Sequence, residues 1–210
     1  HDDAISRLVL NPQIMVAAAG FQANSVAELI QLARARPGQL SYASVGIGSP
    51  QQLGTELLKS RAKIDLVHVP YKGGGPAITD LLGGRVHVHM GSIPSMVPLI
   101  KAGKIKVLGI AANERSNLFP DVPTIAEVVP GYEYIGTWYG IFAQAKAPRE
   151  IVNKLNAAIN AALRTDDLSK LLIAQGSNPQ PLSVEAFTQF VRSDCPTWAR
   201  AVKVAGLKPE

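Results

Sequence analysis

The sequence contains a single cysteine, Cys195, and no apolar run long enough to cross a bilayer. One cysteine cannot form a disulfide within the chain, and Cys195 has no neighbours at metal-ligand spacing. We expect it to be a buried thiol in a helix, beside Pro196. A membrane-spanning helix needs about 20 consecutive apolar residues, so none is predicted. The first residues, HDDAISRLVL, lack the features of a secretory signal, and we expect any export signal to belong to a precursor.

Runs of like charge are also missing. The 21 Lys and Arg residues exceed the 16 Asp and Glu residues and give a formal charge of +5, but they are scattered along the chain. No signature of a nucleic-acid recognition module accompanies them, so we predict no nucleic-acid partner. The positive balance suits a small acidic ligand. With 47% apolar and 18% charged residues, 210 residues can form one domain, or two small ones, with a real core.

A pattern of strand, short loop and helix occurs three times in the first half of the chain. The strands are predicted at residues 40–43, 66–69 and 86–90, each followed by a bend rich in glycine, serine and proline. Such repetition predicts a parallel sheet with crossover helices. Right-handed crossovers bring the loops to the carboxyl edge of the sheet, where open α/β folds bind ligands. One such loop could be only a turn, but three in succession favour a site.

The second of these loops carries the strongest chemical signal. Gly73, Gly74 and Gly75 let the backbone approach a ligand closely, and Pro76 is suited to the first position of the helix that follows. A helix start carries free N–H groups and favours anions. Lys72 adds a mobile positive charge, and Tyr71 adds a ring and a hydroxyl. We hypothesise that this loop holds a small molecule that bears a carboxylate.

The pattern in the remaining sequence indicates a second lobe that is incomplete. After Ile110 the sequence is rich in helical patterns but offers only one aromatic strand, Tyr134–Phe142, to pair with the early strand Ile14–Ala19. A two-stranded sheet is not stable by itself. We therefore predict a complete α/β lobe at residues 21–110 and an incomplete first lobe at residues 1–20 and 111–210. Either a partner chain, as in a homodimer, supplies further strands, or a portion of the protein is missing.

The sequence evidence for a metal site, a nucleotide site or a catalytic site is weaker. His87 and His89 share a strand face, and His68 could lie on the neighbouring strand as a third zinc ligand, but ordinary strand histidines explain all three better. Gly46-Ile47-Gly48 lacks the third glycine of a dinucleotide fingerprint, and Lys72 precedes its glycines, which is the wrong order for a P-loop. The serines of the three loops lack a nucleophile-elbow setting, and the sequence places no histidine as their base. We predict no metal, no cofactor and no catalytic residue.

Several segments together resemble one family. LSYASVGIGSPQQL, VHVPYKGGGPAITDLLGG, IKAGKIKVLGI and FPDVPTIAEVVPGYE, with the strand around Trp138, are similar to the periplasmic receptors of tripartite tricarboxylate transporters, the Bug-type solute-binding proteins. The likeness covers essentially the whole chain in the same order. It implies an α/β fold like that of periplasmic binding proteins, a type II flytrap with two lobes of mixed sheet flanked by helices.

The resemblance also implies a function without chemistry. Such receptors capture a small carboxylate (a di- or tricarboxylic, amino or aromatic acid) in the periplasm and present it to a membrane permease or a sensor. An enzyme acting on a small anion, or the sensing domain of a regulator, remains the alternative. Residues that match the family's ligand-binding positions lie in the three loops and in the aromatic strand: Ser44, Gly46, Gly48, Ser49, Tyr71, Lys72, Gly73, Gly91, Ser92, Trp138 and Tyr139.

Two departures from the family pattern bear on binding. The N-terminal part of the family, with a glycine-rich loop that clasps the carboxylate, has no counterpart here. We therefore expect this chain alone to bind weakly or not at all, and tight one-to-one binding would contradict that expectation. In addition, residues 86–90 read VHVHM where an acidic residue is common, which points to an altered ligand preference.

Overall fold

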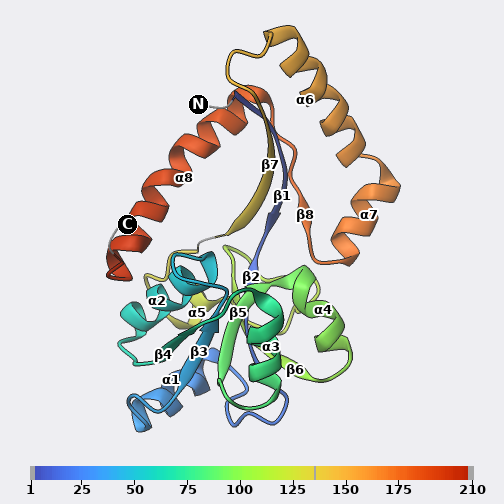
Figure 1. Cartoon of the computed structure of the whole chain (residues 1–210). Coiled ribbons are helices and arrows are strands. Elements are labelled where there is room, and N and C mark those ends of the chain that lie inside the picture. Colours follow the sequence, from blue (N-terminus) through green and yellow to red (C-terminus); the bar gives the residue numbers. More distant parts are fainter. Residues whose placement is uncertain (1–2, 135, 208–210) are drawn as a thin grey trace. The chain divides into compact units, whose positions relative to one another are not determined.

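The computed structural model describes residues 3–134 and 136–207, and it divides into two compact units. Unit 1 comprises residues 1–11 and 137–198, whereas unit 2 comprises residues 12–136 and 199–210. Each unit has its own sheet (Figure 1).

Unit 2 is built on a five-stranded mixed sheet in the order β4-β3-β5-β2-β6. Strand β3 pairs in parallel with β4 and with β5, and β2 pairs antiparallel with β5 and β6. The bounds are β2 Gln13–Ala18, β3 Ser41–Ser44, β4 Val67–Pro70, β5 Val88–Ser92 and β6 Ile105–Ala111. The predicted parallel strands with crossover helices are therefore present, and an antiparallel strand from the N-terminal segment extends the sheet.

The helices of unit 2 begin at capping signals that the sequence displays. Ser25 precedes α1, Ser49 precedes α2 and Thr124 precedes α5, and each hydroxyl accepts a hydrogen bond from a first-turn N–H. Helix α3 begins at Gly74, with Gly73 as its N-cap, two residues before the predicted start at Pro76. Proline is still tolerated there, because the third N–H of a helix has no intrahelical partner. The bounds are α1 Val26–Ala35, α2 Pro50–Ala62, α3 Gly74–Leu82, α4 Ile93–Lys101 and α5 Ile125–Val128.

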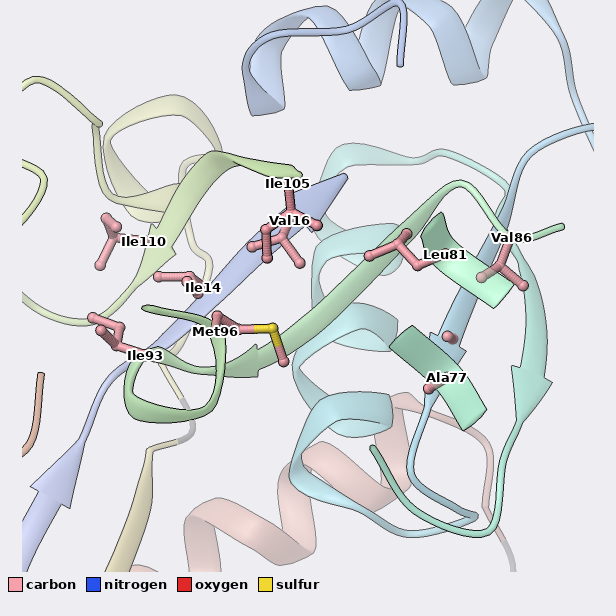
Figure 2. Packing of buried hydrophobic residues seen from close by; sticks show 10 residues of the cluster. Ile14, Val16, Ala77, Leu81, Val86, Ile93, Met96, Ile105 and Ile110 are labelled. Carbon is pink, nitrogen blue, oxygen red and sulfur yellow. The ribbon is translucent and has the colours of Figure 1, made fainter. Parts of the chain in front are cut away.

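One hydrophobic cluster of unit 2 lies between its sheet and helices α3 and α4. Figure 2 shows Ala77 and Leu81 of α3 and Ile93 and Met96 of α4 among the buried residues that pack with β2 and β6. Leu81 and Ile93 are fully buried. This packing holds the starts of α3 and α4 against the sheet.

Unit 1 has a three-stranded antiparallel sheet in the order β7-β1-β8, with helices α6 and α7 and the part of α8 up to Trp198. Helix α6 contributes to a small core in which Val152 packs with Ile5 and Val184. The bounds are β1 Asp3–Asn11, β7 Thr137–Ala143, β8 Asn178–Pro179, α6 Arg149–Leu163, α7 Asp166–Ala174 and α8 Val184–Val204. None of the helices in the described part of the chain is long and apolar enough to cross a membrane.

The structure corrects three expectations. The lobe boundaries at residues 20 and 110 differ from the observed units, because β2 pairs with β5 and β6 and joins residues 12–20 to unit 2. Strand β1 was not predicted, since Ser6 and Arg7 interrupt its apolar pattern. Both are buried and hydrogen-bonded, Ser6 to Asn160 and Arg7 to Gln180. Cys195 is exposed, so the prediction of a buried thiol was wrong.

Replacing Leu81 by Ala should lower the free energy of unfolding by about 2–5 kcal/mol, because it removes a fully buried side chain and leaves a cavity. Urea denaturation followed by circular dichroism measures this change. Leu82→Ala, one residue further along α3 and 39% exposed, is the matched control and should cost far less. Equal losses for the two variants would contradict the packing in Figure 2.

Candidate ligand-binding site

The three predicted loops meet at one edge of the sheet. Strands β4, β3 and β5 are adjacent and parallel. The loops that leave them, toward α3, α2 and α4 respectively, therefore emerge on the same side. A pocket of about 470 Å³ lies there, within the usual size range of small-molecule sites. We call it the carboxyl-edge pocket. It is lined by Val45, Gln51, Gly74, Gly75, Ile78, His89, Gly91, Ser92, Ser95 and Met96.

The β3–α2 loop is held by a chain of hydrogen bonds whose direction can be worked out. The Gly48 N–H donates to Gln52 Oε1 at 2.7 Å, so the Gln52 amide nitrogen must be the atom that donates to His68 Nδ1 at 3.3 Å. His68 Nε2 then carries the proton and donates to Ser44 Oγ at 2.7 Å. The Ser44 hydroxyl in turn donates to the Gly46 carbonyl at 3.1 Å.

The hydroxyl groups of Ser44 and Ser49 form hydrogen bonds within the β3–α2 loop and stabilise its shape. Ser44 is fully buried, and the Ser49 hydroxyl donates to the Gly46 carbonyl at 2.7 Å while it caps α2. Gly46 (φ 140°) and Gly48 (φ 76°) adopt conformations that other residues rarely reach, so the predicted glycines shape this bend. Ligand contact by these four residues stays a prediction.

The β4–α3 loop supplies donors to the pocket. Gly73 has φ 114° and caps α3 without a side chain, so the first N–H groups of the helix, at Gly74 and Gly75, have no intrahelical partner. Tyr71 donates its hydroxyl hydrogen to Asp80 Oδ2 at 2.7 Å and is thereby tied to α3. The Lys72 side chain is exposed, and it has no hydrogen bond or ion pair within the described residues. Tyr71, Lys72 and Gly73 flank the pocket rather than line it.

The β5–α4 loop brings two predicted residues, Gly91 and Ser92, into the pocket wall. The Ser92 and Ser95 hydroxyls lie 3.1 Å apart, and the Ser95 hydroxyl donates to the Ser92 carbonyl at 2.7 Å. His89 also lines the pocket and is only 1% exposed, with Nδ1 3.0 Å from the Ala43 carbonyl oxygen. Burial lowers its pKa.

The histidines do not gather as zinc ligands would. Strand β3 lies between β4 and β5, so His68 is not on the strand next to His89, as the sequence had suggested. His87 bonds to Ser41 and His89 to Ala43, each at its own place. Among the residues that the structure describes, no cluster of histidine, cysteine, aspartate and glutamate could hold a metal ion.

Trp138 and Tyr139 lie on β7 in unit 1, on opposite faces of the strand. Trp138 donates its indole N–H to Asp194 Oδ2 at 2.8 Å and meets Phe187 and Phe190 edge-on, which is the environment of a packed core residue. Tyr139 is 58% exposed and is free to serve as a contact surface. Their role in ligand binding stays a prediction.

Sequence reasoning did not identify six of the pocket residues as ligand contacts: Val45, Gln51, Ile78, His89, Ser95 and Met96. A period of two along β5 places His89 on the same face as Gly91, which had been predicted, and this signal could have identified it. Gln51 was not considered as a ligand contact, because the capping residues Ser49 and Gln52 already explained the polar start of this helix.

Comparison with known proteins assigns the class. A solved structure described as R. palustris Rpa4515 with adipate matches this chain over its whole length, at 33% identity and a TM-score of 0.92, and the match covers 70% of that structure's chain. The structure of the periplasmic binding protein BugD also matches this whole chain, at 28% identity and a TM-score of 0.88, and the match covers 71% of the BugD chain. The fold and the pocket therefore define a protein of the periplasmic-binding-protein class, as predicted.

The family follows from the sequence match. A model described as "Tripartite tricarboxylate transporter family receptor" matches residues 2–207. A protein encoded in the tcbD–tcbE intergenic region of Pseudomonas sp. (strain P51) is 36% identical over 193 residues, 91% of this chain and 57% of its own length. The chain belongs to the tripartite tricarboxylate transporter family of receptors, and the predicted family is confirmed. It spans a little over half the length of this relative.

The histidines make stability depend on pH. Burial lowers the native pKa of His68, His87 and His89 below the ordinary value of 6.5. As the pH falls below this value the unfolded chain binds protons first, so the free energy of unfolding is highest above about pH 6.5 and decreases below it.

We expect urea midpoints to fall between about pH 7.5 and about pH 5.5, with a shallower dependence in a His89→Gln variant. The carboxyl groups of Asp80 and Glu127, whose pKa values are lowered by hydrogen bonds, lose their contribution only at lower pH. A midpoint that does not change over this range would contradict the assignment of neutral imidazoles with lowered pKa values.

Proposed function

We propose that this chain forms the ligand-binding part of an extracytoplasmic receptor for small carboxylates (di- or tricarboxylic, amino or aromatic acids). It serves a tripartite tricarboxylate-type transporter or a sensor. The observation that carries the proposal is the carboxyl-edge pocket, where the start of α3 presents the N–H groups of Gly74 and Gly75 beside the hydroxyls of Ser92 and Ser95. The family and the adipate bound to the R. palustris neighbour support it.

The physics of this pocket favours an anion. The macrodipole of α3 places partial positive charge at its start, and the pocket lining contains no aspartate or glutamate. Each hydrogen bond from a protein N–H to a carboxylate contributes roughly 1.5–3 kcal/mol. Gly91 and Ser92 are proposed as direct contacts. The other predicted residues of unit 2 are proposed to frame the entrance: Ser44, Gly46, Gly48, Ser49, Tyr71, Lys72 and Gly73.

Unit 1 is proposed to be the incomplete first lobe, and Trp138 and Tyr139 are proposed to be its contacts with the ligand. Its helices expose large apolar side chains, including Ile151, Leu171 and Ile173, each at least half exposed. Apolar surface of this kind is typical of a face that another segment or chain covers. A second copy of this chain, in a homodimer, is one partner that could bury these side chains. Periplasmic location, an export signal in the precursor and a membrane permease as partner are proposed from the family.

An enzyme is not favoured. Ser44 and His68 lie within hydrogen-bonding distance, which could suggest a nucleophile and its base. The hydrogen-bond chain from Gln52 leaves the proton on His68 Nε2, so this nitrogen cannot accept one from Ser44. Ser44 is also fully buried. We therefore propose binding without catalysis and without a cofactor.

Gly74→Pro tests the role of the helix start, because it removes one N–H from the pocket at a position where proline suits the helix. We expect the affinity for adipate to fall about tenfold or more, since a hydrogen bond to a carboxylate is lost. A two-dimensional NMR titration is the suitable measurement, because it detects weak binding and reports which residues respond.

The matched control is Gly74→Ala. It keeps the N–H, and a Cβ at this position meets no atom within 4 Å, so binding should be unchanged. Because this chain alone is expected to bind weakly, the titration extends to adipate concentrations in the millimolar range; a wild-type chain whose pocket residues do not respond there contradicts the proposed function. If Gly74→Pro binds as the wild type does, the site is elsewhere.

A further inference from the structure

Two hydrogen-bond acceptors in the carboxyl-edge pocket have no donor. They are His89 Nε2, on β5, and Gln51 Oε1, in the first turn of α2. Because an acceptor that is left without a partner when a ligand fills the pocket is unfavourable, their presence in one pocket restricts which groups of a ligand can lie there.

The state of His89 follows from its neighbour. The Ala43 carbonyl oxygen can only accept a hydrogen bond, so His89 Nδ1, 3.0 Å away, must carry the hydrogen. The ring is 99% buried and burial lowers its pKa, so it is neutral, and Nε2 holds a lone pair. Within the described residues Nε2 has no hydrogen-bond partner.

Gly91 leaves room for the Met96 side chain beside this lone pair. A Cβ at Gly91 would lie 3.3 Å from His89 Nε2 and 2.7 Å from the terminal methyl carbon of Met96. The Met96 methyl group therefore occupies the space that a side chain at Gly91 would take, and Gly91, His89 and Met96 all line the pocket. Any other residue at 91 would displace this methyl group.

Gln51 adds the second acceptor. Its Oε1 is buried and has no hydrogen-bond partner among the described residues. It lines the same pocket as His89, whereas the free N–H groups of Gly74 and Gly75 are donors. The pocket is thus lined by both hydrogen-bond donors and hydrogen-bond acceptors.

We propose that the pocket selects acids that carry an uncharged hydrogen-bond donor, an amide or a hydroxyl, for His89 and Gln51, in addition to a carboxylate. This inference rests on the proposed function and narrows its ligand class. A second carboxylate would oppose its lone pairs to those of the two acceptors. An ammonium group would be desolvated without a counter-charge, since no acidic residue lines the pocket.

The test compares adipate with its monoamide, which have the same length and differ only in one terminal group. NMR titration of the chain near neutral pH should give roughly tenfold tighter binding of the monoamide, from the hydrogen bonds that only it can donate. His89→Met removes the acceptor with little change in volume and should abolish most of this preference. His87→Met is the matched control, because His87 lies two residues away and does not line the pocket, and it should keep the preference.

A second readout does not depend on affinity. Long-range ¹H–¹⁵N spectra should show the proton of His89 on Nδ1 and an unprotonated Nε2 in the free chain. The Nε2 resonance should move toward the protonated range when the monoamide is added. Absence of binding by either acid would overturn the proposed function and this inference together. Binding of both acids with equal affinity, a preference that survives His89→Met, or a proton on Nε2 would overturn this inference alone.

Discussion

The parallel pairing of β3 with β4 on one side and with β5 on the other is the constraint on which unit 2 depends. It places three strand ends in a row and directs three loops to the same edge. The buried faces of α3 and α4 then fix where each helix begins. Since helix starts carry unpaired N–H groups, sheet register alone brings a set of backbone donors to one pocket without any charged side chain.

The loops around the pocket satisfy most of their own polar groups. Gln52, His68, Ser44 and Ser49 bond to one another or to loop backbone, so their hydroxyl and imidazole groups hold the shape of the β3–α2 bend. A site fixed in this way loses little conformational entropy when a ligand enters, which favours affinity. The groups left over, rather than the most reactive side chains, define what can be recognised there.

The sequence predicted the architecture of unit 2 well, because glycine, proline and capping residues mark each strand–loop–helix unit and the periods of the apolar residues are clear. It could not predict β1, where Ser6 and Arg7 are buried through hydrogen bonds to residues more than 150 positions away. The sequence pointed to the loops that line the pocket, but it did not single out His89 or Gln51. His89 was indistinguishable from His87 until the pairing of β5 with β3 placed its ring against Ala43.

The two units are interleaved along the chain. Residues 1–11 enter unit 1, the next 125 residues form most of unit 2, and the polypeptide then returns to complete unit 1 before its last segment rejoins unit 2. Neither unit therefore corresponds to one uninterrupted stretch of the gene. A premature stop codon before residue 137 would leave β1 without either partner strand, and a late start after residue 18 would remove β2 from between β5 and β6.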